Sequence, residues 1–298
     1  MRGRARVFTD SDVRTRLSAE IAVRAAGRAL VDAQRGLLVA PPRLHADIGD
    51  LALAFTAGGY PEGRVGFRAY GTWPGKSDQV VLVWDPEGRL EGVVVGWELG
   101  ARRTGALGAN AAAVLARPDA ARVAVVGSGT QAWTQLWALT AVRSLHEVSV
   151  YSPTSEHRER FALRARDELG LQAGAASSAR AAVADADIVI LATRAHTPVV
   201  DADWISNGAH VTTVGPKTVA EHETPPELAE RAAIVVSDSP EQADTYAQPF
   251  FTPRPLVHLG AVMTGATPGR QGNDEITLYC STGLAGSELV VAQELFTV

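Results

Sequence analysis

The hydrophobic residues near the N-terminus of this chain of 298 residues have the spacing of a helix followed by a sheet. Apolar residues recur at helical intervals behind a Thr-Asp-Ser cap cluster at 9–11, which predicts a helix over residues 10–30. Four apolar runs then follow, and the last two are joined by the turn D-P-E-G at 85–88. Tight turns between strands indicate an antiparallel sheet, and its expected strands are residues 51–56, 65–70, 80–84 and 90–95.

The pattern changes near Arg117, where an alanine-rich segment that predicts a second helix, 101–116, ends at R-P-D. Beyond it strands alternate with helices, which is typical of a parallel, doubly wound sheet. We therefore predict an α/β fold, with a Rossmann-type domain over residues 117–275 and a second, α+β domain over residues 1–116 with a mainly antiparallel sheet. The tail, from about 276 to 298, is assigned to this second domain, and completion of the Rossmann domain is the alternative. The expected parallel strands are residues 123–126, 148–151, 188–193, 211–215 and 234–237.

The segment R-V-A-V-V-G-S-G-T-Q-A at 122–132 places a glycine turn between a strand and a helix. In this G-x-G-x-x-A pattern, Gly127 permits the tight turn, Gly129 lets the backbone approach a pyrophosphate, and Ala132 keeps the helix close to its strand. The free N–H groups and positive dipole end of the helix favour a phosphate. The motif predicts a dinucleotide site, with a strand-turn-helix that binds no ligand as the alternative. The expected cofactor-binding residues are Gly127, Ser128, Gly129, Thr130, Gln131 and Ala132.

The residues after the second Rossmann strand indicate which cofactor binds. Enzymes that use NAD commonly carry Asp or Glu there, but this chain reads Tyr-Ser-Pro-Thr at 151–154. Ser152 and Thr154 can donate hydrogen bonds to a 2′-phosphate, and Arg158 can supply positive charge. We expect NADP(H) to be preferred, with NAD(H) as the alternative. Glu156 weakens this interpretation, because it can pair with a basic neighbour or point toward the ribose.

Composition excludes several classes of partner. Hydrophobic residues make up 46% of the chain and the formal net charge is -5, so no basic excess points to nucleic acid or to a membrane surface. Cys280 is the single cysteine, which excludes a disulfide framework within the chain, and no Cys/His spacing indicates a metal site. We read no export signal and no membrane span, and expect a cytoplasmic protein whose partner is a small molecule.

Seven motifs, taken in order, resemble the ornithine cyclodeaminase/mu-crystallin family over nearly the whole chain. The resemblance implies hydride transfer between a nicotinamide and the α-carbon of an amino or imino acid. It also implies that a substrate-binding domain, which forms a homodimer, accompanies the Rossmann domain. The motifs are P-P-R at 41–43, G-F-R at 66–68, R-T-G-A at 103–106, G-S-G-T-Q-A at 127–132, A-D-I-V-I-L-A-T at 186–193, G-A-H-V-T-T-V-G at 208–215, and P-G-R followed by E-I-T-L-Y-C-S-T-G-L-A within 268–285.

The resemblance also implies roles for single residues. Arg43 and Arg103 take the positions of arginines that bind the substrate carboxylate, for which a bidentate guanidinium suits position and plane. Arg68 stands where the family usually has a lysine, and an arginine can clamp a carboxylate but cannot exchange a proton. Further cofactor contacts are assigned to Thr104, Thr193 and Ser281.

One departure from the family pattern bears on the reaction. Cyclodeaminases of the family carry an aspartate just after the position of Gly215, whereas this chain reads Pro216 and Lys217. The missing acid argues against deamination, and Lys217, with Arg68, becomes the catalytic candidate. We expect an NADP(H)-dependent reductase of a small imino acid or cyclic imine that runs reversibly as an amino-acid dehydrogenase. The alternatives are an ornithine cyclodeaminase-like lyase with bound NAD⁺ and a non-catalytic NADP(H)-binding protein of the crystallin type.

Overall fold

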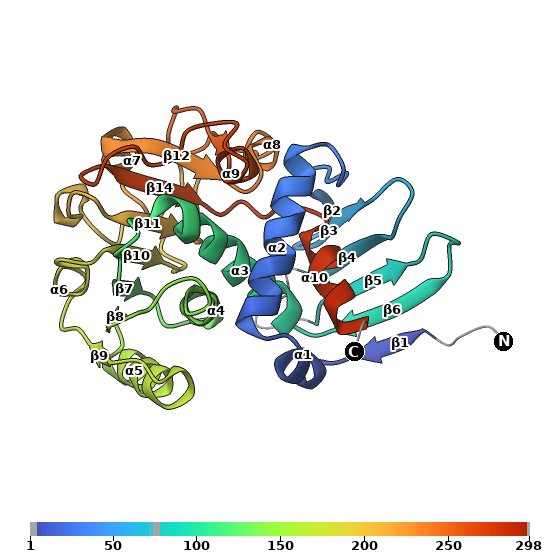
Figure 1. The fold of residues 1–298 in the computed structure, drawn as a ribbon, viewed down its shortest axis with the longest axis horizontal. Helices are drawn as coiled ribbons and strands as arrows, with labels where there is room; N and C mark the ends of the chain where they lie inside the picture. Colours follow the sequence, from blue (N-terminus) through green and yellow to red (C-terminus); the bar gives the residue numbers. More distant parts are fainter. Residues whose placement is uncertain (1–4, 72, 74–77, 297–298) are drawn as a thin grey trace. The chain divides into compact units, whose positions relative to one another are not determined.

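The computed structural model describes residues 5–71, 73 and 78–296, and the chain divides into two compact units (Figure 1). One unit comprises Met1–Arg103 and Gly283–Val298, and the other comprises Thr104–Thr282. The sequence placed the boundaries near residues 116 and 276. Helix α3 (Glu98–Leu115) runs through the first division point, so that it contributes Arg103 to one unit and Thr104 to the other.

The first unit contains a six-stranded sheet in the order β1-β6-β5-β4-β3-β2. Strands β2 to β6 pair antiparallel and β1 joins β6 in parallel, which confirms the mainly antiparallel sheet. The four expected strands correspond to β3 to β6, whereas β1 and β2 were not expected. The bounds are β1 Arg6–Phe8, β2 Leu44–Ile48, β3 Leu51–Gly59, β4 Val65–Gly71, β5 Val80–Trp84 and β6 Leu90–Val95.

Two helices form where the sequence predicted one over residues 10–30, namely α1 (Asp10–Arg16) and α2 (Ala19–Gln34). The break occurs because Leu17 adopts an extended conformation and Ser18 caps α2, accepting a hydrogen bond from the Ile21 N–H at 3.3 Å. The C-terminal helix α10 (Ser287–Phe296) packs against α2 and against strands β3, β4 and β5 (Figure 1). It therefore brings residues from the end of the chain onto one face of this sheet.

The second unit contains an eight-stranded parallel sheet in the order β13-β12-β14-β11-β10-β7-β8-β9. The apolar segment I-T-L-Y-C forms β14, which is buried and lies between β11 and β12, so the part of the tail before Gly283 belongs to this unit. Strand order reverses beside β7, which is where doubly wound sheets bind ligands. The bounds are β7 Arg122–Val126, β8 Glu147–Tyr151, β9 Ala173–Ala175, β10 Ile188–Leu191, β11 His210–Thr213, β12 Ala232–Ser237, β13 Val257–His258 and β14 Ile276–Cys280.

Two hydrophobic clusters pack around this parallel sheet. One gathers Leu228 of α7 and Ala202 with Val211 and Leu278, and the other gathers Leu136 and Phe161 of α4 and α5 with strand residues. The doubly wound α/β arrangement is thus confirmed. The helices are α4 Thr130–Leu139, α5 Ser155–Leu169, α6 Ala179–Val183, α7 Pro226–Arg231, α8 Pro240–Ala243 and α9 Leu259–Met263, with a 3-10 turn at Ala202–Trp204. Among the described residues, no helix combines the length and hydropathy needed to cross a membrane.

Candidate active site

The glycine turn between β7 and α4 has the conformation that its sequence predicts. Gly127 has a φ of +117°, a region that favours glycine, and a Cβ there would overlap the carbonyl oxygen of Ala192. Its N–H donates to the Tyr151 carbonyl at 2.8 Å, which ties the turn to the end of β8. Only a glycine fits this position without moving β10.

The second glycine of the motif, Gly129, has open space around it. Gly129 is the N-cap of α4, with φ -86° and ψ -176°, and nothing lies within 4 Å of a Cβ built on it. Gly129 and Thr130 are exposed, whereas Ala132 is fully buried against the strand. Ser128 and Gln131 lie at the same helix start, half-buried. This open helix N-terminus fits a pyrophosphate, since its first N–H groups have no partner within the helix.

The residues after β8 place a guanidinium beside the expected ribose position. Arg158 of α5 turns back toward the strand end, where its Nη1 donates to the Ser152 carbonyl at 2.9 Å, and its Cζ lies 5.7 Å from the Tyr151 ring centroid. Ser152 is buried and its hydroxyl donates to the Thr154 carbonyl at 3.2 Å. Glu156 forms an ion pair with Arg160. The Glu156 carboxylate thus pairs with a basic neighbour, which favours this role over a contact with the ribose.

Thr104 is positioned by a close crossing of α3 and α4. Gly105 and Gly108 face α4 so closely that a Cβ on either would overlap Thr134 or Gln135. The Gln135 amide donates to the Thr104 carbonyl at 3.1 Å. Thr104 is therefore fixed against the helix whose N-terminus forms the candidate phosphate site.

A buried carboxylate joins the ends of β10 and β11. Glu223 is fully buried, and its Oε2 accepts hydrogen bonds from the N–H and the hydroxyl of Thr193, both at 2.7 Å. Its Oε1 accepts from the Thr213 hydroxyl at 2.8 Å and from the N–H groups of Val214 and Gly215. The sequence assigned Thr193 to the cofactor, and the structure shows that its donors already bind Glu223. This carboxylate holds the carboxyl edge of the sheet together.

Lys217 is buried on the loop after β11, where its Nζ donates to the Gly215 carbonyl. Its charge opposes the effect of burial on Cys280, and burial prevails and raises the pKa of that thiol to about 12. Cys280 is therefore a protonated packing residue and not a nucleophile. Ser281, 8% exposed, donates its N–H to the Thr213 carbonyl at 3.0 Å. The structure thus places Lys217 and Ser281 at the carboxyl edge of the parallel sheet.

In the other unit, Arg43 and Arg103 converge on a glycine. A Cβ on Gly283, which has a φ of +93°, would lie 3.0 Å from Nη2 of Arg43 and 3.7 Å from Nη1 of Arg103. Arg103 is 4% exposed, so its charge is largely removed from water. Two guanidinium groups around a position without a side chain form a suitable site for one carboxylate.

The third predicted arginine, Arg68, forms hydrogen bonds with other side chains of the protein. Nε and Nη2 of Arg68 donate to Oε1 of Gln79 at 2.9 and 2.6 Å, and its Cζ lies 4.2 Å from the Tyr70 ring centroid. Its Nη1 donates to Oε1 of Glu288 at 2.9 Å. The same Glu288 oxygen accepts from Nη2 of Arg103. Arg68 and Arg103 are thus joined through one buried carboxylate.

Glu288 was missed in the sequence analysis. It is the second residue of α10 and is 2% exposed. Burial acts to raise the pKa of Glu288, but the charges of Arg103 and Arg68 outweigh burial and hold the pKa below its usual value. Oε2 of Glu288 and Nε of Arg103 are buried and have no hydrogen-bond partner within the described parts of the chain. Unsatisfied buried polar atoms are uncommon, so two in one cluster make this arrangement unusual for a protein interior.

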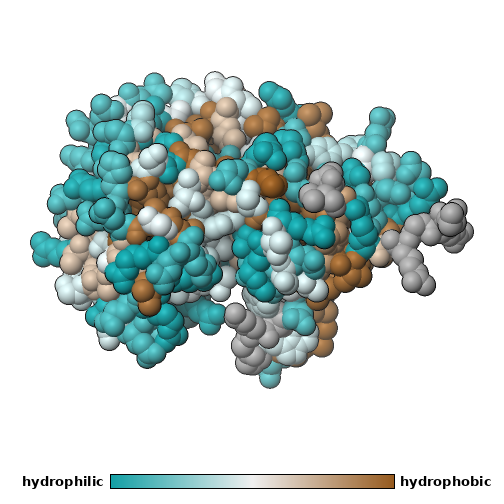
Figure 2. Space-filling model, turned by 60° about the horizontal axis from the view of Figure 1, so that its bottom comes forward, coloured by the Kyte–Doolittle hydropathy of each residue, from teal (hydrophilic) through white to brown (hydrophobic). Residues whose placement is uncertain are grey.

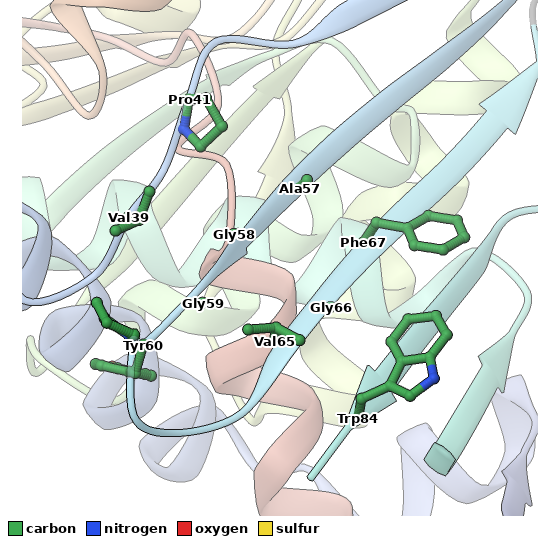
Figure 3. A pocket seen from close by; sticks show the side chains of 11 residues that line it. Val39, Pro41, Ala57, Gly58, Gly59, Tyr60, Val65, Gly66, Phe67 and Trp84 are labelled. Carbon is green, nitrogen blue, oxygen red and sulfur yellow. The ribbon is translucent and has the colours of Figure 1, made fainter. Parts of the chain in front are cut away.

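A separate cavity of about 450 Å³ opens over strands β3 and β4. Figure 3 shows that its walls are apolar: Phe67 and Trp84 lie together at one end, with ring centroids 5.7 Å apart, and Tyr60 lies at the other. None of the predicted site residues lines it. It is therefore distinct from the arginine cluster around Gly283. Within the residues that the structure describes, no group of three or more His, Cys, Asp or Glu side chains is arranged to hold a metal ion.

Comparisons with known proteins show the family of the chain and similar folds. A sequence model of the ornithine cyclodeaminase/mu-crystallin family matches residues 4–296. The Delta(1)-pyrroline-2-carboxylate reductase of Bacillus cereus is 32% identical over 203 residues, which cover 65% of this chain and 62% of that protein.

Two solved structures are similar over almost the whole chain. The Delta(1)-pyrroline-2-carboxylate reductase of Thermococcus litoralis, in complex with NADH and L-proline, has a TM-score of 0.87 at 26% identity, covering 98% of this chain and 96% of that one. An archaeal alanine dehydrogenase dimer with bound NAD has a TM-score of 0.88 at 25% identity, covering 98% and 95%.

Proposed function

The chain belongs to the ornithine cyclodeaminase/mu-crystallin family, and we propose that it is an NADP(H)-dependent oxidoreductase that reduces the C=N bond of a small imino acid or cyclic imine. In the reverse direction it is an amino-acid dehydrogenase. The observation that carries the proposal is the pair of buried or half-buried arginines converging on Gly283, in a chain whose other unit has an open glycine turn at a helix N-terminus.

We assign cofactor binding to the second unit. The N–H groups at the start of α4, with Ser128 and Thr130, hold the pyrophosphate, and Thr104 lies against the same helix. Arg158, with Ser152 and Thr154, holds a 2′-phosphate, because no free carboxylate stands at the end of β8. When bound, the nicotinamide supplies the hydride. NAD(H) remains the alternative cofactor.

Substrate binding is assigned to the first unit. Arg43 and Arg103 grip the carboxylate, and this fixes the plane of the imine so that its α-carbon can accept a hydride. Arg68 supports them through Glu288, and two of its five N–H groups can still reach a substrate. We assign to Arg68 this binding and supporting role, since a guanidinium does not exchange protons at neutral pH.

The proton for the substrate nitrogen is assigned to Lys217. Reduction of an imine adds a hydride to carbon and a proton to nitrogen, so one acid is needed at the site. Lys217 is buried on the loop after β11, at the carboxyl edge of the parallel sheet. The structure offers no aspartate on the loop at 215–217, which disfavours the cyclodeaminase alternative.

We further propose that the protein forms a homodimer through the outer face of the antiparallel sheet. Residues that face away from α10, among them Phe67, Leu82 and Trp84, are apolar and only half-buried, and Leu44 and Ile48 of β2 are 70% and 60% exposed. Figure 2 shows hydrophobic surface on the right of the view, the side on which Figure 1 draws this sheet. A second copy with the same apolar face can cover it, and analytical ultracentrifugation tests this. The cytoplasmic location stays a prediction.

Cofactor turnover with a panel of cyclic imines tests the proposed function. We expect NADPH oxidation with Δ1-pyrroline-2-carboxylate, and a KM that rises about tenfold or more in Arg103→Lys while the Kd for NADPH changes less than about twofold. Lysine keeps the charge but loses the second donor edge. Ammonia release from ornithine without net cofactor consumption indicates a cyclodeaminase instead, and tight cofactor binding with neither reaction indicates a binding protein.

A further inference from the structure

We propose that Glu288 is a specificity-determining residue: a built-in carboxylate that occupies one of two anion positions on Arg103 and so restricts the substrate to imines with a single carboxylate. The inference rests on the proposed function and names the substrate class of that site.

The first anion position is filled by the protein itself. Oε1 of Glu288 accepts from Nη1 of Arg68 at 2.9 Å and from Nη2 of Arg103. Two guanidinium groups that meet on one carboxylate oxygen reproduce the contacts that a substrate carboxylate would receive. The side chains are 12% exposed for Arg68 and 3% for Glu288, so water competes little for these bonds.

The second position lies on the opposite edge of Arg103. Its Nη1 lies 3.7 Å from the place that a Cβ on Gly283 would occupy. Nη2 of Arg43 lies 3.0 Å from the same place. Because residue 283 has no side chain, a carboxylate oxygen can take up this space. Nη2 of Arg103 is engaged by Glu288, so the substrate carboxylate is gripped by Nη1 of Arg103 together with Arg43.

The charges explain why the restriction is to one carboxylate. Three arginines and one glutamate leave two net positive charges in the cluster, and Glu288 already takes the anion position between Arg68 and Arg103. A second substrate carboxylate near Arg68 or Arg103 would face the carboxylate of Glu288, and like charges at such distances repel strongly in a buried site. Glu288 thus excludes dicarboxylic imines by occupying the place that they need.

Glu288→Gln tests this, because it keeps the shape of the side chain and removes the charge. We expect the wild type to reduce Δ1-pyrroline-2-carboxylate with a higher kcat/KM than iminosuccinate, formed in the assay from oxaloacetate and ammonia. The variant should lower this ratio by about tenfold or more, as expected when a competing charge-assisted bond is removed. Glu294→Gln is the matched control, since Glu294 lies on the same helix and pairs with Arg28 at 2.7 Å. This control should keep the wild-type ratio.

A binding measurement on the wild type keeps the inference testable even if Glu288→Gln does not fold. Calorimetry on the NADPH-loaded protein compares acetate with malonate, neither of which can react. We expect tighter binding of acetate in the wild type and, in a folded Glu288→Gln, a shift of the affinity ratio toward malonate. Tighter binding of malonate by the wild type, or a ratio unchanged in Glu288→Gln, overturns the inference. If the anion preference holds but no imine is reduced, the proposed function fails while the assignment of the two anion positions stands.

Discussion

Alanine should have different effects at the two glycines of the turn after β7. At Gly127 it should lower stability, and at Gly129 it should weaken cofactor binding. In Gly127→Ala, a residue with a side chain must adopt a φ of +117°, which costs roughly 1–3 kcal/mol. Its methyl group also overlaps the Ala192 carbonyl, and such overpacking adds about 1–3 kcal/mol. At roughly 2–4 °C per kcal/mol for a unit of this size, we expect Tm to fall by about 5–20 °C.

Gly129→Ala should leave the fold nearly unchanged. Its backbone has an ordinary extended conformation and nothing lies within 4 Å of the new methyl group, so the change in unfolding free energy should stay within about 1 kcal/mol. The methyl group would instead stand where a pyrophosphate approaches the backbone. Loss of one charge-assisted hydrogen bond weakens NADPH by roughly 10- to 150-fold.

Differential scanning calorimetry and titration calorimetry with NADPH separate the two effects. Wild-type affinity in Gly129→Ala would show that this loop does not hold the pyrophosphate. A wild-type Tm in Gly127→Ala would show that the turn does not require glycine.

Three further changes test other parts of the account. Arg158→Ala should weaken NADPH about tenfold or more relative to NADH, and an unchanged ratio of the two Kd values contradicts a 2′-phosphate site. Burial lowers the pKa of His210 to about 3, so the unfolded chain binds a proton that the folded chain does not, and stability should fall as pH drops below about 6.5. Between pH 6.5 and 5 the loss is about 2 kcal/mol, and denaturant unfolding of His210→Gln should show a smaller loss; an equal loss assigns it to other groups. Lys217→Met should lower kcat by about 100-fold with little change in the Kd for NADPH, and an unchanged kcat removes Lys217 from proton transfer.

The sequence predicted most of the fold because the main elements carry local signals. The five expected parallel strands correspond to β7, β8, β10, β11 and β12. The short strands β9 and β13 were missed, since three or two residues show no periodicity. The single helix expected over residues 10–30 was wrong because Ser18, a strong N-cap residue, starts a new helix inside an unbroken apolar pattern.

The candidate site was predictable only where motifs mark it. Gly127 and Gly129 follow from their spacing, and the arginines follow from the family resemblance. Glu288 could not be found in this way, because it lies 185 residues from Arg103 and only the packing of α10 on the sheet brings the two together. Glu223 is a similar case: no motif marks it, yet it is fully buried and accepts five hydrogen bonds at the ends of two strands.

The most direct test of the proposed reduction follows the hydride itself. NADPH deuterated at C4 of the nicotinamide, on the transferred face, is incubated with the protein and Δ1-pyrroline-2-carboxylate, and the product is analysed by mass spectrometry and NMR. Hydride transfer from the cofactor predicts proline with one deuterium on its α-carbon, formed in proportion to the NADPH consumed. Proline without deuterium, or no consumption of either labelled or unlabelled cofactor with any carboxylated imine, contradicts it.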